Sequence, residues 1–260
     1  MNTNDQGFKM NNNTNPFIFK TSLASVVAQA PEFILEDFLP LAKRKVTMLS
    51  AKGGSGKSFI AIQAGIRLTQ QCKKVGMWLS EDESGEIRER ADLINSRILF
   101  NSDPLSEHLY INGSENYPPQ VTPGVFEMIR EAWQGLDLVI IDPLIGFFSG
   151  NENDNSQAKQ FMSVLTSVAT QNNQAILVLH HNTKQDQEGN STTRGASAFV
   201  DAVRILYNLK YDKDKQKHII KIEKDNLNAK KFLGSEFDIK AIPFTIAYKT
   251  KEADNGRNKY

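Results

Sequence analysis

The sequence has a single cysteine, Cys72, among its 260 residues. One cysteine cannot form a disulfide within the chain, and this scarcity is typical of proteins from reducing compartments. The sequence also lacks an excess of either charge, because 31 Lys and Arg residues face 30 Asp and Glu residues, for a formal net charge of +1. A near-neutral chain exerts no global attraction on nucleic acid, so any site for a polyanion must be local.

Long apolar runs are missing as well. The sequence contains no run of about 18 apolar residues that would serve as a membrane-spanning helix, and no charged and then apolar segment of the kind that forms a signal peptide. These absences predict a cytoplasmic protein without a membrane partner. Hydrophobic residues nevertheless make up 40% of the chain, which is ample for the core of one large α/β domain.

The most informative stretch is residues 51–58, which read Ala-Lys-Gly-Gly-Ser-Gly-Lys-Ser. It follows the apolar run 46–50 and precedes the apolar run 59–65, an order that predicts a strand, a loop and a buried helix. Glycines let backbone N–H groups turn toward phosphate oxygens, and the positive end of the following helix attracts the same anion. The stretch is therefore predicted to bind a nucleoside triphosphate.

Within this loop each residue has an expected role. The backbone cradle for the phosphates consists of Gly53, Gly54, Ser55 and Gly56. Lys57 is expected to reach the β- and γ-phosphates, while the Ser58 hydroxyl helps to hold Mg²⁺. The loop departs from the strict pattern in having Ala51 where the first glycine is usual, and alanine is small enough to be tolerated there.

The order of the apolar runs predicts an α/β fold. Strand-like runs at 74–80, 136–142 and 174–179 alternate with helical patterns, whereas the later runs at 203–207, 218–222 and 244–248 follow one another across short polar turns. This change predicts a mostly parallel sheet flanked by helices, with antiparallel strands at its C-terminal edge.

The chain is expected to hold a single domain between two tails. Residues 1–16 are rich in Asn and other polar residues and are predicted to be a disordered tail, and residues 250–260 a second polar tail. The domain is predicted to span 17–249. Its first part, 17–40, is too apolar for a free linker and is expected to form a short helix and a turn that pack on something, with a neighbouring subunit as one option.

Polar residues stand at the carboxyl ends of the predicted strands, where ligands collect in an open α/β sheet. Asp142 follows an apolar strand and is suited to hold Mg²⁺, because a hard cation prefers oxygen ligands. Glu81 follows the strand predicted over 74–80, and a carboxylate there would position the attacking water for hydrolysis. Asp82 and Glu83 compete for the same role, and solvated strand-end carboxylates are the alternative for all three.

His180 and His181 end the strand predicted over 174–179. One of them is expected to contact the γ-phosphate, and the alternative is a structural histidine pair. Arg204 lies within a predicted apolar strand, where a lone charge is costly without a partner. It must extend to solvent, pair within its subunit or face an anion outside it. Lys224 closes a later strand, and for both residues a solvated charge on an edge strand is the alternative.

With these residues in place, the chain resembles the RecA-like ATPases and, within them, is most similar to the plasmid RepA-type hexameric replicative helicases. The resemblance covers residues 21–228 and rests on an ordered set of motifs. Besides the glycine-rich loop, these are 78–82 (Trp-Leu-Ser-Glu-Asp), 138–144 (Leu-Val-Ile-Ile-Asp-Pro-Leu), 179–182 (Leu-His-His-Asn), 194–197 (Arg-Gly-Ala-Ser), 200–204 (Val-Asp-Ala-Val-Arg) and 224–226 (Lys-Asp-Asn).

The resemblance implies a RecA-like core that uses ATP and Mg²⁺, assembles head to tail as a homohexameric ring, and translocates on single-stranded DNA at plasmid or phage replication forks. It implies Glu81 as the catalytic carboxylate, Asp142 on the metal and His181 as the γ-phosphate sensor. Arg204 would be the finger that enters the neighbouring subunit's site, and Lys224 would reach the same nucleotide. A replication initiator or a primase is the further protein partner that it suggests.

Two loops, after Ile145 and after His181, are expected to face the channel of such a ring and to bind DNA. Residues 149–155 are acid-leaning, which disfavours phosphate contacts, whereas the second loop carries Lys184 and ends near Arg194. The predicted DNA affinity is therefore weak and strongly salt-dependent. These features leave a second hypothesis, a regulatory or accessory ATPase that loads or remodels a protein partner without unwinding DNA.

Overall fold

The computed structural model describes residues 19, 21–181, 197–212, 214 and 216–239. The chain divides into two compact units, Met1–Ala30 and Pro31–Tyr260. In the first unit the described residues form one short 3₁₀ helix, η1 (Leu23–Ser25), and its residues are exposed. The predicted tails, 1–16 and 250–260, and the predicted strand 244–248 lie outside the described residues.

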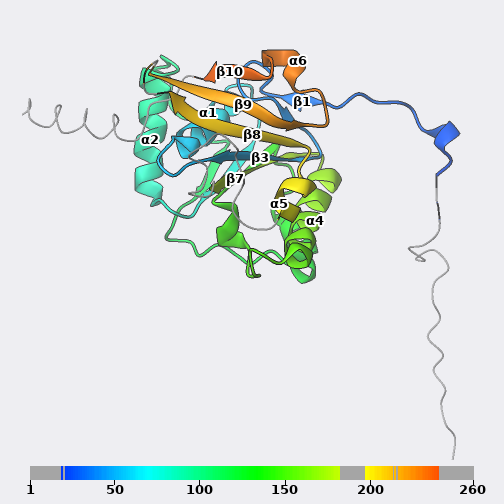
Figure 1. The fold of residues 1–260 in the computed structure, drawn as a ribbon. Helices are drawn as coiled ribbons and strands as arrows, with labels where there is room; N and C mark the ends of the chain where they lie inside the picture. The colour runs from blue at the N-terminus through cyan, green and yellow to red at the C-terminus, as the bar shows by residue number, and fades with distance from the viewer. Residues whose placement is uncertain (1–18, 20, 182–196, 213, 215, 240–260) are drawn as a thin grey trace, which may run out of the picture. The chain divides into compact units, whose positions relative to one another are not determined.

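An eight-stranded sheet organises the second unit, in the order β10-β9-β8-β3-β7-β6-β4-β5 (Figure 1). The strands are β3 (Val46–Ala51), β4 (Val75–Leu79), β5 (Leu109–Asn112), β6 (Leu138–Asp142), β7 (Ala175–His181), β8 (Ile205–Asp212), β9 (Lys217–Asp225) and β10 (Glu236–Ile239). Pairing is parallel from β8 through β3, β7, β6 and β4 to β5. It is antiparallel between β8 and β9 and between β9 and β10. This arrangement confirms the predicted fold class.

Helices cover both faces of the sheet, which explains why its central strands are apolar throughout. One buried cluster includes Leu49 of β3 and the apolar face of α1 (Lys57–Thr69) and α2 (Ser84–Arg97). Met48, the residue before Leu49 in β3, belongs to a second buried cluster. This cluster includes residues of α3 (Phe126–Ala132), α4 (Asn155–Gln171) and α5 (Ser197–Ala202). Successive residues of a strand point to opposite faces, so the two clusters lie on opposite sides of the sheet. Three short helices complete the unit: η2 (Pro123–Val125), η3 (Leu144–Phe147) and α6 (Lys230–Leu233).

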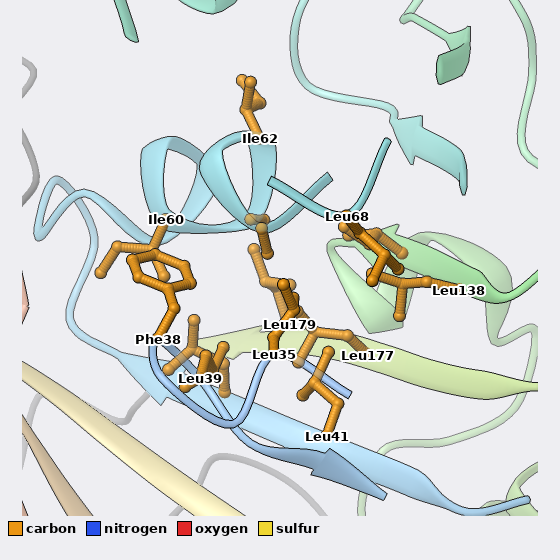
Figure 2. Packing of buried hydrophobic residues seen from close by; sticks show 14 of the residues in the cluster. Leu35, Phe38, Leu39, Leu41, Ile60, Ile62, Leu68, Leu138, Leu177 and Leu179 are labelled. Carbon is orange, nitrogen blue, oxygen red and sulfur yellow. The ribbon is translucent and has the colours of Figure 1, made fainter. Parts of the chain in front are cut away.

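The apolar segment before the glycine-rich loop packs in part into the chain's own core. Beyond the short helix η1, β1 (Phe33–Ile34) and β2 (Leu41–Ala42) pair as a small antiparallel sheet. The residues between them include Leu35, Phe38 and Leu39, which are buried beside α1 and β7 (Figure 2). The segment from Phe33 onward therefore belongs to the core of this subunit, while packing of residues 17–30 on a neighbour stays a prediction.

α4 begins at Asn155, because the Asp154 side chain accepts hydrogen bonds from the backbone N–H groups of Ser156 and Gln157 and so caps the helix. The predicted start of the strand over 203–207 was wrong. Arg204 does not lie inside a strand, since β8 begins at Ile205, where its pairing with β3 starts. Arg204 is instead an exposed residue between α5 and β8.

We expect Leu39→Ala to destabilise the protein by about 3 kcal/mol, because the Leu39 side chain is fully buried and its removal leaves a cavity. Urea unfolding monitored by circular dichroism measures this. The matched control is Met128→Ala, since Met128 is 69% exposed and should change stability by less than about 0.5 kcal/mol. A loss that disappears at low protein concentration would instead place this segment in an interface between subunits.

Candidate nucleotide-binding site

The glycine-rich loop joins β3 to α1 and adopts a conformation that requires glycine at two positions. Gly54 has a φ of 74° and Gly56, the N-cap of α1, a φ of 90°, both in the left-handed region. Ala51, by contrast, is the last residue of β3 and pairs with His181 of β7. Because extended backbone suits alanine, the departure from the usual first glycine has no structural cost.

A cavity of about 240 Å³ opens above this loop. Its walls come from the start of α1 and from residues at the carboxyl ends of β4, β6 and β7. These ends meet because parallel strands all finish at the same edge of a sheet. The cavity thus brings together seven predicted site residues: Gly54, Gly56, Lys57, Ser58, Glu81, Asp142 and His181.

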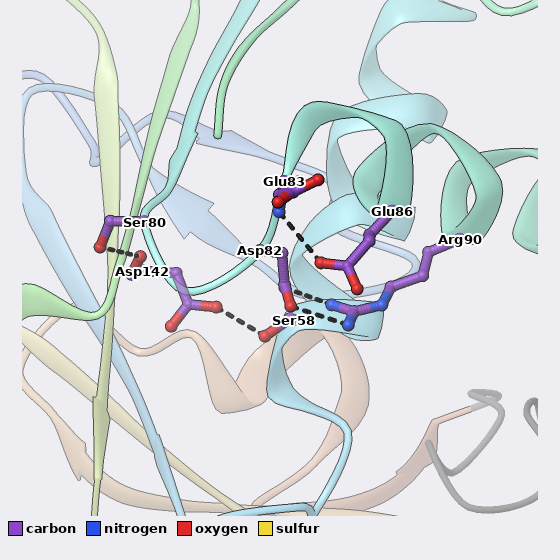
Figure 3. Close-up of polar contacts among 7 residues, drawn as sticks. All are labelled: Ser58, Ser80, Asp82, Glu83, Glu86, Arg90 and Asp142. Atoms are coloured by element: carbon purple, nitrogen blue, oxygen red, sulfur yellow. Dashed lines mark hydrogen bonds and ion pairs between the residues drawn. The ribbon is translucent and has the colours of Figure 1, made fainter. Parts of the chain in front are cut away.

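Ser58 and Asp142 form the candidate metal-binding pair. Ser58 Oγ donates a hydrogen bond of 2.6 Å to Asp142 Oδ2 (Figure 3), which leaves the lone pairs of the hydroxyl available to a cation. Burial raises the pKa of the Asp142 carboxyl to about 6, although the Ser58 hydrogen bond and the Lys57 charge oppose this shift. An oxygen-only pair with one buried carboxylate fits Mg²⁺, which takes few protein ligands beside water and phosphate oxygens.

Lys57 is buried at the base of the cavity. Its Nζ lies 3.4 Å from the Ala51 carbonyl oxygen and 3.3 Å from His181 Nδ1. Burial lowers the pKa of the Lys57 ammonium, while the carboxylates of Asp142 and Glu81 act in the opposite direction. A desolvated cation without a full counter-charge is well suited to attract phosphate oxygens.

Glu81 faces His181 across the cavity, with 3.7 Å between Glu81 Oε1 and His181 Nε2. The pKa of the Glu81 carboxyl is lowered chiefly by the facing His181 ring, and further by Lys57, against the effect of partial burial. The neighbouring His180 points to the other face of the sheet, where its ring centroid lies 6.0 Å from that of Phe199 in α5. Of the two histidines, His181 is therefore the one at the nucleotide side.

The other two carboxylates of this loop have structural partners (Figure 3). Asp82 accepts two hydrogen bonds from the Arg90 guanidinium, one of them 2.8 Å long, and both side chains are largely buried. Glu83 caps α2, where its backbone N–H donates to Glu86 Oε2 at 3.0 Å. Glu81 alone of the three faces Lys57 and His181. Arg90 lines the cavity but was missed from the sequence, because nothing in a polar helix indicates which of its arginines turns inward.

Comparison with protein families identifies the family of this chain. A family model described as an AAA domain matches residues 20–187, more than half of the chain. The chain belongs to the AAA domain family. A search of curated proteins by sequence found no match.

Solved structures resemble this AAA domain at low sequence identity, and the likeness shows the fold alone. The ATPase domain of G40P is 16% identical with a TM-score of 0.54, over 71% of this chain and 78% of that one. The RadB recombinase is 15% identical with a TM-score of 0.55, over 71% and 83%. A DnaB-like replicative helicase, solved for its interactions with primase, is 17% identical with a TM-score of 0.55, over 71% of this chain and 53% of that one.

Arg204 and Lys224 lie away from the cavity of this AAA domain. Thr47, near the start of β3, pairs with Ile205, so Arg204 sits at the end of the sheet opposite the glycine-rich loop. Lys224 pairs with Leu206 at the same end, and its Nζ donates to the carbonyl oxygens of Val200 and Asp201 at 3.0 and 2.9 Å. Neither side chain can reach the cavity at the glycine-rich loop of its own chain.

The remaining predicted residues, Lys184 and Arg194, lie outside the residues that the structure describes. Within the described part of this AAA domain, no helix is long and apolar enough to span a membrane. The described residues also contain no group of three or more His, Cys, Asp and Glu side chains arranged for a metal ion.

We expect Asp142→Asn to stabilise the metal-free protein by about 1 kcal/mol more at pH 8 than at pH 5. Folding raises the pKa of Asp142 from 3.8 to about 6, so the folded state holds the proton more tightly. The stability contributed by the protonated carboxyl is present below pH 3.8 and is lost as the pH rises through about 6. Asparagine cannot ionise and avoids this loss.

Urea unfolding in EDTA at the two pH values measures the difference. The matched control is Asp92→Asn, the same substitution at a side chain that is 54% exposed and pairs with Arg88. An equal effect of Asp142→Asn at both pH values would show that the buried carboxyl does not titrate in this range.

Proposed function

We propose that this chain is an ATP-hydrolysing motor of the RecA-like class, which assembles as a homohexameric ring and translocates on single-stranded DNA in plasmid or phage replication. The observation that carries the ATPase part is the convergence of Lys57, the Ser58–Asp142 pair and Glu81 on one cavity at the glycine-rich loop. Membership of the AAA domain family agrees with it. The helicase part draws support from the fold shared with a DnaB-like replicative helicase.

In the proposed reaction the chain's own residues bind and orient. Backbone N–H groups of the glycine-rich loop and the Lys57 ammonium hold the β- and γ-phosphates. Ser58 and Asp142 would hold Mg²⁺, which neutralises phosphate charge when bound. Glu81 accepts a hydrogen bond from the attacking water. Because its pKa is lowered, Glu81 is a weak base, and its contribution is to orient the water more than to take its proton.

His181 is suited to detect the γ-phosphate. Its Nδ1 lies 3.3 Å from Lys57 Nζ and its Nε2 lies 3.7 Å from Glu81 Oε1. A γ-phosphate that attracts Lys57 would remove the contact between Lys57 Nζ and His181 Nδ1. The hydrogen bonding of the imidazole ring would then depend on whether a γ-phosphate is present. His181 is the last residue of β7, and the segment with Lys184 and Arg194 follows directly in the sequence.

The proposed ring gives Arg204 and Lys224 a role that they cannot have within one subunit. Both lie at the sheet end opposite the glycine-rich loop, so any nucleotide that they touch must belong to another copy. A head-to-tail interface supplies such a contact and closes into a ring. Lys224 would have to release the carbonyl oxygens of α5 that it now contacts. A primase or a replication initiator is the proposed protein partner.

A regulatory or accessory ATPase is the second candidate function. It is favoured by the lack of positive charge that would attract DNA. The chain is near neutral, and the segment 149–155, which precedes α4, carries Glu152 and Asp154 without a basic residue. Such a surface repels DNA phosphates. An ATPase of this kind would use the same cavity to remodel a protein partner.

We expect ATP hydrolysis at low salt to be stimulated by single-stranded DNA, and ATP to drive strand separation on a forked duplex. Both are measured in the same samples, with Lys57→Ala as the inactive control because it lacks the phosphate-binding ammonium. The double variant Lys184→Ala, Arg194→Ala should keep basal hydrolysis but lose the stimulation. Hydrolysis that ignores DNA and separates no strands, in a sample shown to form rings, would favour the accessory ATPase.

We expect Arg204→Ala to lower kcat for ATP hydrolysis by about a thousandfold while the Kd for a fluorescent ATP analogue stays nearly unchanged. An arginine that acts in trans stabilises the transition state of a neighbour and contributes little to ground-state binding. Arg88→Ala is the control, since Arg88 is exposed and pairs with Asp92 of its own helix.

Mixing Arg204→Ala with Lys57→Ala should restore part of the activity, because some interfaces then combine an intact loop with an intact Arg204. Loss of nucleotide binding in Arg204→Ala, or no recovery on mixing, would rule out the role between subunits.

A further inference from the structure

A buried arginine, Arg90 of α2, lines the nucleotide cavity beside Glu81. A charge taken out of water is costly unless it is paired and hydrogen-bonded. Arginine is among the residues that are rarely buried without such a partner. The contacts of Arg90 therefore indicate what this part of the cavity uses it for.

The Arg90 guanidinium and the Asp82 carboxylate form a two-pronged contact. Nη2 donates to Asp82 Oδ1 at 2.8 Å, and Nη1 donates to Oδ2 (Figure 3). The two side chains are 8% and 16% exposed. The guanidinium also lies 5.7 Å from the centroid of the Phe59 ring. Because the donors of a guanidinium are planar and fixed in direction, such a contact specifies the orientation of both partners.

The backbone after β4 is held on both sides of Glu81. On one side the Ser80 N–H donates to the Asp142 carbonyl oxygen at 2.8 Å. On the other side the Asp82 carbonyl oxygen accepts from the Ser114 N–H at 2.7 Å. The side chain of Asp82 is held as well, by the guanidinium. The backbone of Glu81 is thus fixed between two anchored residues.

The Glu81 side chain, by contrast, is loosely held. It is 58% exposed, and its Oε1 lies 3.7 Å from His181 Nε2, which is longer than a hydrogen bond. The direction of such a side chain depends on the position of its backbone. A group that orients a reacting water must be placed closely, since a displacement of about 1 Å can lower a rate about a hundredfold.

We propose that Arg90 is a positioning residue for ATP hydrolysis, which holds Glu81 in place for the attacking water through its contact with Asp82. The inference rests on the proposed ATPase function and adds to it the means by which Glu81 is oriented. Arg90 stays on Asp82 while the nucleotide binds, so it contributes to kcat and not to nucleotide affinity.

The test removes both partners, because removal of one would leave a buried charge without its counter-charge and destabilise the fold. Apolar replacement of a whole buried pair is tolerated much better. The double variant Asp82→Val, Arg90→Met should therefore unfold in urea near the midpoint of the unaltered chain. Its kcat for ATP hydrolysis should fall about thirtyfold, while the Kd for a fluorescent ATP analogue changes by less than about twofold.

The matched control is Asp92→Val, Arg88→Met, the same two substitutions at an exposed ion pair of the same helix. It should leave kcat unchanged. A buried pair that served stability alone would also leave kcat unchanged in Asp82→Val, Arg90→Met, and that result would overturn the proposal. A weakening of nucleotide binding as large as the loss of kcat would overturn it too, because Arg90 would then contact the nucleotide itself.

Arg90→Lys tests the geometry in a chain that keeps both buried charges. An ammonium lacks the two parallel donors of a guanidinium, so kcat should fall about tenfold with the Kd unchanged. An unaltered kcat would show that the charge of Arg90 suffices and that its directed contact positions nothing.

A double-mutant cycle identifies Glu81 as the residue that Arg90 positions. Glu81→Gln alone should lower kcat about a hundredfold. Addition of Asp82→Val and Arg90→Met to Glu81→Gln should lower kcat by less than about a further threefold, because the group that they position is already lost. A larger additional loss would show that the pair acts independently of Glu81 and would contradict the proposal.

A measurement without ATP separates this inference from a failure of the proposed function. The pKa of the Glu81 carboxyl is lowered chiefly by the facing His181 ring, and further by Lys57. Carbon-13 NMR titration of the nucleotide-free chain should show a higher Glu81 pKa in Asp82→Val, Arg90→Met, because the carboxyl moves away from both groups.

An unchanged Glu81 pKa in that variant would overturn the placement of Glu81 by Arg90, whether or not the chain hydrolyses ATP. A raised pKa together with an unaltered chain that hydrolyses no ATP would support the placement and refute the ATPase function.

Discussion

The parallel pairing of β3 with β7 is the constraint on which the site depends. Its register pairs Ala51 with His181, the last residues of the two strands. The glycine-rich loop therefore begins beside His181. The pairing of β6 with β7 and of β4 with β6 then brings Asp142 and the residues after Leu79 to the same edge. A shift of one residue in any of these pairs would turn every side chain of a strand to the other face. The nucleotide cavity is thus a consequence of strand register.

Within that frame the buried charges depend on one another. Lys57 and Asp142 are both removed from water, and burial lowers the pKa of one and raises the pKa of the other. Each is also the opposite charge that partly offsets the cost of the other. A phosphate group would supply a full negative charge to Lys57, and a divalent cation would supply a full positive charge to Asp142. A site whose buried cation and buried anion are each only partly neutralised is suited to a ligand that carries both charges.

The sequence alone predicted those parts of the fold and site that a local pattern specifies. The glycine-rich loop between two apolar runs indicated α1, and the polar ends of apolar strands indicated Glu81, Asp142 and the pair His180–His181. The structure brings Glu81, Asp142 and His181 of these to one cavity. Contacts that depend on how the elements pack gave no such signal. The inward turn of Arg90 toward Asp82 depends on how α2 packs, and the start of β8 after Arg204 depends on its pairing with β3. The spacing of apolar residues along the sequence predicts neither the orientation of Arg90 nor the first residue of β8.

The first turn of α1 shows how a helix that is largely buried can still offer a binding site. Its first N–H groups and Gly56 face the cavity where phosphate is expected. The helix dipole adds attraction for an anion at this end. The side chains agree, since Lys57 stands there as well. A helix that is buried on most of its surface exposes little else to a ligand, so its first turn is where its chemistry is available.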